Sequence, residues 1–211
     1  MSEISKQEIL SKIAAVRQVR TAATIVNNFE NEEIYKAILP DKINCFKTEL
    51  EAISGQCFLY NNDIKLVEQL KSIIETKKIT TLFCKDNKII ELLVKHNIPF
   101  TNQDADFENM EAGITSCEYL IARTGSIIIS SDGDSGRKMS VFPPIHIVIS
   151  TSSQILDYPE DAYLAVKNKY KNSLPSIITT ITGPSRTADI EKTLVLGAHG
   201  PKELIVFLSN N

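Results

Sequence analysis

The sequence has 211 residues, which suits one domain and is short for two catalytic domains, since domains typically hold roughly 100 to 200 residues. Hydrophobic residues make up 43% of the chain and charged residues 23%, a globular composition that excludes disorder throughout. The 23 basic and 26 acidic residues give a formal net charge of -3, which argues against the basic surface of a nucleic-acid-binding protein.

The first predicted element is an amphipathic helix. Between residues 4 and 25, apolar residues recur three or four positions apart, with charged residues elsewhere around the helix. A polar, irregular stretch follows, and a second helix is predicted over residues 45–53. We therefore expect residues 1–50 to form a helical extension that packs on a main domain of residues 51–211.

Beyond residue 55, short β-rich runs alternate with helical segments. Such alternation is typical of βαβ units, which are right-handed and build a parallel sheet with helices on its faces. Strands outnumber helices after residue 112, so part of the sheet is expected to be antiparallel. The predicted fold class is α/β, with a mixed, mainly parallel sheet flanked by helices. Strands are predicted over residues 57–60, 79–84, 113–122, 126–130, 145–150, 176–181 and 204–208, and helices over residues 64–75, 87–95 and 159–170.

The cysteines are widely spaced and form no C-x-x-C pair, so neither a metal site nor a cofactor held by this chain is predicted. Three of the four adjoin apolar or aromatic residues, where a free thiol behaves as a small buried hydrophobe. The first residues do not resemble a signal peptide, and no run approaches the roughly 18 apolar residues of a membrane span. We expect a cytoplasmic protein with reduced cysteines and no membrane span.

The densest set of candidate residues directly follows the predicted strand that ends at Ile181. Ligands of open α/β sheets bind beyond the carboxyl ends of strands, where turns expose backbone N–H groups. Arg186 offers a bidentate fork to a carboxylate or phosphate, and nearby acids can orient it or transfer protons. The alternative is a plain turn and helix start with the acids facing water. The candidates are Gly183, Pro184, Ser185, Arg186, Thr187, Asp189 and Glu191.

Two further turns are rich in small residues that let a ligand approach the backbone closely. One contains Thr124, Gly125 and Ser126, and the other contains Gly197 and Gly200. Within the second turn, His199 is either a proton-transfer group, because its ordinary pKa lies near neutrality, or only a turn residue.

Other polar residues favour structural roles. His146 lies between two isoleucines, where strand alternation predicts a buried core histidine, and His96 follows a predicted helix as a favourable C-terminal residue. The Gly-rich loop of residues 132–137 contains two aspartates, for which exposure to solvent is a simpler interpretation than binding of a cation. Cys117 beside Glu118 suggests a nucleophile and its base, but a buried thiol is the simpler interpretation. The common enzyme motifs for nucleotides, metals and nucleophilic serines are absent from the sequence.

Several motifs, in one order along the chain, resemble the lactate utilization protein C family, a part of the wider lactate-utilization (LUD) domain. The resemblance covers about half of the chain, from Gly113 to Leu208, whereas the front is similar only in layout. It depends on Gly113-Ile114-Thr115, Thr124-Gly125-Ser126, Gly136-Arg137, Phe142-Pro143-Pro144-Ile145-His146, Thr182-Gly183-Pro184-Ser185-Arg186 and Leu196-Gly197-Ala198-His199-Gly200.

The resemblance implies the fold of sugar-phosphate isomerases and CoA transferases. It also implies a subunit that oxidises L-lactate to pyruvate together with two partner proteins, one cysteine-rich and one carrying iron–sulfur clusters. A chain without clustered cysteines fits such a set, because the partners then supply the electron transfer. Two rival hypotheses remain: a free-standing enzyme on a phosphorylated, CoA-linked or folate-like molecule, and an assembly module without catalysis.

The site predictions combine the chemistry of the candidate residues with the resemblance. The family usually has an acid before the Thr-Gly pair, where this chain has Arg123. With Arg137 and Arg186, this residue is expected to form a basic site for a small anionic ligand. The predicted catalytic residues are His199, Glu118 and Asp189, and the predicted ligand-binding residues are Thr124, Gly125, Ser126, Arg137, Gly183, Pro184, Ser185, Arg186, Thr187, Glu191, Gly197 and Gly200.

Overall fold

The computed structural model describes residues 6–12, 37–171, 173–190 and 193–210. Contacts divide the chain into two units, Met1–Ala37 and Ile38–Asn211. In the first unit, residues 6–12 are helical, and the rest of the predicted helix over residues 4–25 lies outside the described residues. The second helix, α2 (Lys42–Ala52), belongs to the second unit, and the expected division at residues 50 and 51 stays a prediction.

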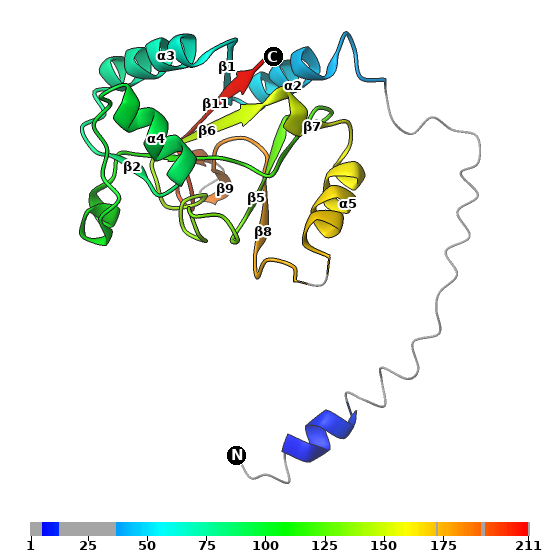
Figure 1. The fold of residues 1–211 in the computed structure, drawn as a ribbon. Helices are drawn as coiled ribbons and strands as arrows, with labels where there is room; N and C mark the ends of the chain where they lie inside the picture. Colours follow the sequence, from blue (N-terminus) through cyan, green and yellow to red (C-terminus); the bar gives the residue numbers. More distant parts are fainter. Residues whose placement is uncertain (1–5, 13–36, 172, 191–192, 211) are drawn as a thin grey trace. The chain divides into compact units, whose positions relative to one another are not determined.

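A five-stranded parallel sheet forms the centre of the second unit (Figure 1). Every neighbouring pair in this sheet is parallel, so all five carboxyl ends meet at one edge. The predicted α/β class with a parallel sheet flanked by helices is confirmed. In spatial order, the strands are β1 (Gln56–Tyr60), β11 (Glu203–Ser209), β6 (Ile145–Thr151), β3 (Ala112–Thr115) and β2 (Leu82–Cys84).

Two crossover helices cover one face of this sheet. Asn62 caps α3 (Asp63–Thr76) through its side chain, and Asp86 caps α4 (Asn87–Lys95) by accepting two backbone N–H groups. Their apolar faces share a core with every second residue of the strands, such as Ile147 and Phe207. In Figure 1 these two helices lie together, on the opposite side of the domain from α5.

A second, four-stranded sheet packs on the other face, where Val148 and Val206 of the first sheet meet Leu120 and Ile127. Its central strand β5 is antiparallel to both of its neighbours. The helix α5 (Pro159–Tyr170) packs on this sheet, and α2 closes the core between the two sheets. The strands are, in spatial order, β7 (Ile155–Leu156), β4 (Tyr119–Ile121), β5 (Ser126–Ser130) and β8 (Ile178–Ile181).

The smaller elements are a hairpin and two short 3-10 helices. β9 (Arg186–Ile190) pairs with β10 (Thr193–Leu196), so the helix start in the alternative interpretation of this segment is wrong and a strand takes its place. The 3-10 helices are η1 (Asp104–Asn109) and η2 (Ser152–Gln154). None of the helices in the described ranges combines the length and apolar character that crossing a membrane requires.

The single strand predicted over residues 113–122 is wrong. The structure splits this run into β3 of the parallel sheet and β4 of the second sheet, and Ser116, Cys117 and Glu118 connect the two. The pattern suggested one strand because both pieces are nearly fully buried, and a continuous apolar run carries no mark of where a chain changes sheets. This change of sheet decides where the candidate residues lie.

Candidate functional site

Two of the predicted ligand turns pack against α2. Gly125 has φ +60°, and a Cβ atom there would overlap with the backbone of Glu49 and Leu50. Gly183 has φ +82°, and its Cβ atom would lie 2.8 Å from the carbonyl oxygen of Ile53. Both glycines therefore permit a close approach of α2, which takes the place that the sequence prediction gave to a ligand.

The hydroxyl groups beside these two glycines bond to one another. The Thr124 Oγ1 donates to Ser126 Oγ over 2.8 Å, and Ser126 Oγ lies 2.9 Å from Thr182 Oγ1. Pro184 is buried in the same region. These side chains join the ends of β5 and β8, so their polar atoms are used within the protein.

The predicted turn at Ser185 and the predicted turn of Gly197 and Gly200 do come together. The Ser185 N–H donates to the Pro201 carbonyl over 2.8 Å, and the Gly197 N–H donates to the Ser185 carbonyl over 3.0 Å. A Cβ atom on Gly200 would lie 3.2 Å from the Ser185 Cβ. His199 in this turn is exposed. The structure therefore joins these turns through backbone hydrogen bonds at the surface.

The three predicted basic residues do not form one site. Arg123 makes an ion pair with Glu49, with 2.7 Å between Nη1 and Oε1, and the Arg186 guanidinium donates to the Ile53 carbonyl. Arg137 is exposed and donates to Ser176 Oγ over 2.7 Å. Ser176 adjoins the start of β8, whereas Arg186 follows the end of that strand, so the length of the strand separates Arg137 from the other two.

The remaining candidates lie in the β9–β10 hairpin. Arg186 and Thr187 pair with Leu196 and Val195 across it. Asp189 belongs to β9, but its side chain, like the whole of Glu191, lies outside the described residues. The predicted roles of these two acids stay predictions.

The reason for this placement is the direction of the second sheet. The turns were predicted from the rule that ligands of open α/β sheets bind beyond the carboxyl ends of strands. The turn after β8 instead bonds to Pro201, which precedes β11, so it lies near the amino edge of the parallel sheet. The rule that ligands bind at carboxyl ends applies to the parallel strands only, and it directs attention to the opposite edge.

A cavity of about 830 Å³ lies at that opposite edge. Its lining includes residues at or just after the carboxyl ends of four parallel strands: Tyr60 at the end of β1, Asp86 after β2, Ser116 after β3 and Thr151 at the end of β6. Ser130, at the end of β5, closes it from the second sheet. A concave space with both polar and apolar lining at this edge of a parallel sheet is the default location of a ligand site.

Among the predicted site residues that the structure describes, Glu118 alone lines the cavity, and it is the centre of a polar cluster. We define the Glu118 cluster as Glu118, Ser130, Lys169 and Tyr170. Glu118 Oε1 accepts hydrogen bonds of 2.5 Å from both Ser130 and Tyr170, and Oε2 lies 2.6 Å from the Lys169 Nζ. The Glu118 side chain is 10% exposed, whereas Lys169 is 52% exposed, so the ion pair joins the buried carboxylate to the open cavity.

The environment keeps Glu118 ionised. Burial opposes ionisation, but the hydrogen bonds from Lys169, Ser130 and Tyr170 outweigh it and lower the pKa of the carboxyl group. The same hydrogen bond to Glu118 raises the pKa of Lys169. Both groups are therefore charged near neutral pH, and Glu118 holds three donors in fixed positions at the cavity wall.

The environment of Cys117 next to Glu118 disfavours the thiolate form that a nucleophile requires. Burial and the Glu118 carboxylate raise the pKa of the Cys117 thiol, so it is protonated near neutral pH. Gln154 Nε2 donates to the Cys117 carbonyl over 2.6 Å and fixes the connection between β3 and β4. The sequence predicts a buried thiol at this position, and the structure shows Cys117 partly exposed in the cavity lining.

The other side of the cavity is formed by α4 and by the loop after β5. Asp86 accepts from Ser116 Oγ and from the first N–H groups of α4, so its carboxylate is engaged in capping. Asp134 of the predicted Gly-rich loop accepts from the Asn87 side chain over 2.9 Å and ties that loop to α4. Among the residues that the structure describes, no group of three or more histidines, cysteines and acids could hold a metal ion.

His146 is the predicted core histidine. Its side chain is 0% exposed, and Nε2 lies 2.9 Å from the Thr115 Oγ1. Burial lowers the pKa of His146 to about 4, so the imidazole is neutral near pH 7. The prediction of a buried histidine is confirmed.

Comparison with known proteins gives a family and a fold. Residues 43–209 match the LUD domain family. Lactate utilization protein C of Geobacillus sp. (strain WCH70) is 36% identical over 198 residues, which cover 84% of this chain and 78% of that protein. The crystal structure of a DUF162 family protein from Deinococcus radiodurans superimposes with a TM-score of 0.59 at 17% identity, covering 80% of this chain and 96% of that chain.

Other relatives match over a shorter region. An uncharacterized protein of Neisseria meningitidis is 36% identical over 100 residues, and lactate utilization protein C of Bacillus licheniformis is 38% identical over 96 residues. These alignments cover 47% and 44% of this chain, and 42% and 40% of the relatives. The chain thus spans less than half of the length of these two relatives.

Proposed function

Because this chain belongs to the LUD domain family, as its sequence motifs predicted, we propose that it is a subunit of a system for the utilization of L-lactate. The proposal is supported by its similarity, over most of its length, to a protein named lactate utilization protein C. The system oxidises L-lactate to pyruvate, with a cysteine-rich and an iron–sulfur partner protein that carry the electrons. The four free cysteines agree with a place in the reducing cytoplasm.

We further propose that this subunit binds a carboxylate in the cavity, with the Lys169 ammonium as the binding group. The observation that carries this assignment is the Glu118 cluster: a buried, ionised carboxylate holds Lys169 at the wall of a cavity at the carboxyl edge of the sheet. An ammonium group has three donors, and Glu118 uses one of them. The remaining donors can bind a ligand carboxylate with charge-assisted hydrogen bonds.

The neighbouring hydroxyl groups suit the rest of a 2-hydroxy acid. Ser130 and Tyr170 both donate to Glu118, and Ser130 also accepts from the Asp132 N–H, so each oxygen atom keeps a lone pair that can accept from a ligand hydroxyl. In this proposal, Lys169 binds the ligand and Glu118 is a positioning residue that acts through Lys169 and Tyr170. The ligand-binding roles predicted for the turns at Gly125 and Gly183 are not part of the proposal, because α2 packs on both.

Replacing Lys169 with methionine tests this function. We expect the affinity for L-lactate, measured by calorimetry, to fall by about tenfold or more, because a hydrogen bond between charged groups is lost. In a host that lacks its own copy of the gene, the wild-type gene should restore growth on L-lactate, and the Lys169→Met gene should restore it poorly.

Lys167→Met provides the matched control, since Lys167 is an exposed lysine of the same helix outside the cavity. The Lys167→Met protein should bind L-lactate with the affinity of the wild type, and its gene should restore growth on L-lactate as the wild-type gene does. If Lys169→Met folds, as judged by its melting temperature, and still binds lactate and supports growth like the control, the proposed binding group is wrong.

A further inference from the structure

The cavity is much larger than lactate. Its volume of about 830 Å³ lies in the upper part of the range, roughly 300 to 1,000 Å³, of sites for drug-sized ligands and cofactors. Lactate bound at Lys169 would leave most of this space to water. The size of the site therefore indicates a ligand with a larger body attached to the carboxylate.

Part of the cavity wall is apolar. Leu66 of α3 and Ile89 and Leu92 of α4 line it from the helix side, and Ile129 and Ile149 line it from the two sheets. Water in contact with such a wall is replaced favourably by an apolar group, at about 25 cal/mol per Å² of buried area. The body of the ligand is therefore expected to be apolar.

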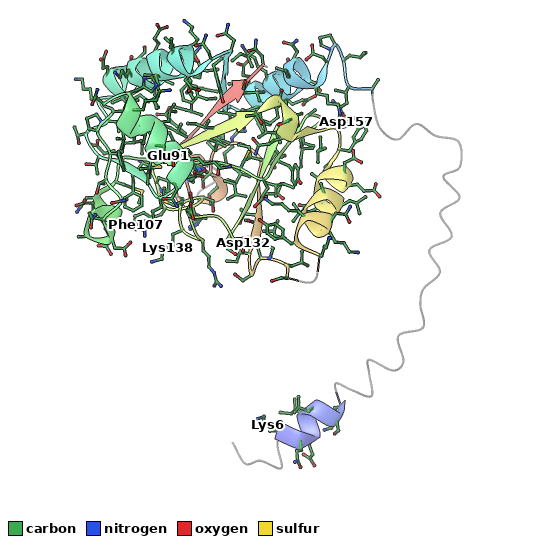
Figure 2. All side chains as sticks on the ribbon, viewed as in Figure 1. Lys6, Glu91, Phe107, Asp132, Lys138 and Asp157 are labelled. Carbon is green, nitrogen blue, oxygen red and sulfur yellow. The ribbon has the colours of Figure 1, made fainter. Side chains whose placement is uncertain are left out.

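The charge of the cavity lining argues against ligands that carry a diphosphate or triphosphate group. Five carboxylates and three ammonium groups line the cavity, which leaves a formal excess of two negative charges. Two of the carboxylates, Glu91 on α4 and Asp132 after β5, are labelled in Figure 2, and the structure gives neither of them an ion-pair partner. A diphosphate or triphosphate would add several negative charges to this environment and would be repelled.

From the size, the apolar wall and the charge together, we propose that the cavity binds a monocarboxylate with a large apolar or aromatic body, in preference to lactate itself and to polyphosphate nucleotides. The carboxylate binds Lys169, and the body packs between Leu92 and Ile149. This inference rests on the proposed function for its carboxylate-binding group but adds the class of ligand.

Calorimetric titration of the full chain with four probes tests the inference: L-lactate, L-3-phenyllactate, the uncharged 3-phenylpropanol and ATP. L-3-phenyllactate should bind about tenfold or more tighter than L-lactate, because its ring buries apolar area that lactate lacks. ATP should bind more weakly than either acid. Equal affinity for the two acids, or tighter binding of ATP, would overturn the inference.

Two variants separate this inference from the proposed function. Leu92→Ser, on the partly exposed face of α4, should lower the affinity for L-3-phenyllactate about tenfold more than the affinity for L-lactate, and so remove most of the preference. Lys169→Met should lower the affinity for both acids by the same factor and leave the affinity for 3-phenylpropanol unchanged. A preference that survives Leu92→Ser contradicts the apolar wall, whereas unchanged binding of both acids by Lys169→Met contradicts the carboxylate-binding group alone.

Discussion

Gly125→Ala is expected to lower the free energy of unfolding by about 3 kcal/mol, since two costs add at this position. The backbone has φ +60°, which an alanine adopts with strain, and the new Cβ atom overlaps with the backbone of Glu49 and Leu50. A helix backbone cannot move away as the end of a flexible side chain can, so α2 must shift from its place over the two sheets. Chemical denaturation of both proteins measures the difference.

Gly133→Ala is the matched control for this prediction. Gly133 lies in the loop after β5, and a Cβ atom there has no other atom within 4 Å. The control should therefore change the free energy of unfolding by less than about 0.5 kcal/mol. If Gly125→Ala is as stable as Gly133→Ala, α2 does not pack on the turn as described.

His146 is expected to make the protein lose stability below neutral pH. Its pKa is about 4 in the folded protein, against 6.5 for an ordinary histidine, because burial disfavours the charged ring. Between these two values the unfolded chain binds a proton that the folded chain does not, so stability falls as the pH falls from 6.5 to 4. The contribution of His146 to this fall is about 3 kcal/mol.

Urea denaturation at pH 7 and pH 4 measures this contribution by difference. His146→Gln can still bond to Thr115 but does not titrate, so its stability should fall by about 3 kcal/mol less than that of the wild type over this interval. His199→Gln, in an exposed turn, should follow the wild type. An unchanged pH dependence in His146→Gln would show that the ring is accessible to protons in the folded protein.

Much of the fold could be predicted from the sequence. The helix over residues 87–95 and the strand over residues 126–130 were predicted with the bounds that the structure has, because capping residues and turns flank clear periodic patterns. The hairpin of β9 and β10 was not predicted. Gly183 and Pro184 suggested a turn before a helix. The two strands of the hairpin are short and contain polar residues, so they lack the alternation that would have indicated strands instead.

The site was harder to predict because it depends on which strands share a sheet. A buried run gives no sign that residues 113–122 divide between two sheets. Without that division, the sequence prediction placed the turns after β4 and β8 at the same edge as the carboxyl ends of the parallel strands. The same rule, applied to the ends of β2, β3 and β6, would have found Asp86, Ser116 and Thr151.

No feature of the sequence indicated that Lys169 and Tyr170 belong to the candidate site. They lie at the end of α5, 51 and 52 residues after Glu118, and an amphipathic helix of this kind has lysines and tyrosines on any exposed face. Only the packing of α5 on the second sheet places them beside Ser130 and Glu118. A contact between distant segments of this kind is a property of the fold and not of either segment.

A crystal structure of the protein grown with L-3-phenyllactate would locate the bound ligand without reference to activity. We expect the carboxylate within hydrogen-bonding distance of the Lys169 Nζ, with the ring between Leu92 and Ile149. A ligand bound instead at the turns of Gly183 and Gly200, with its carboxylate on Arg186, would contradict the assignment of the cavity and favour the amino edge of the sheet.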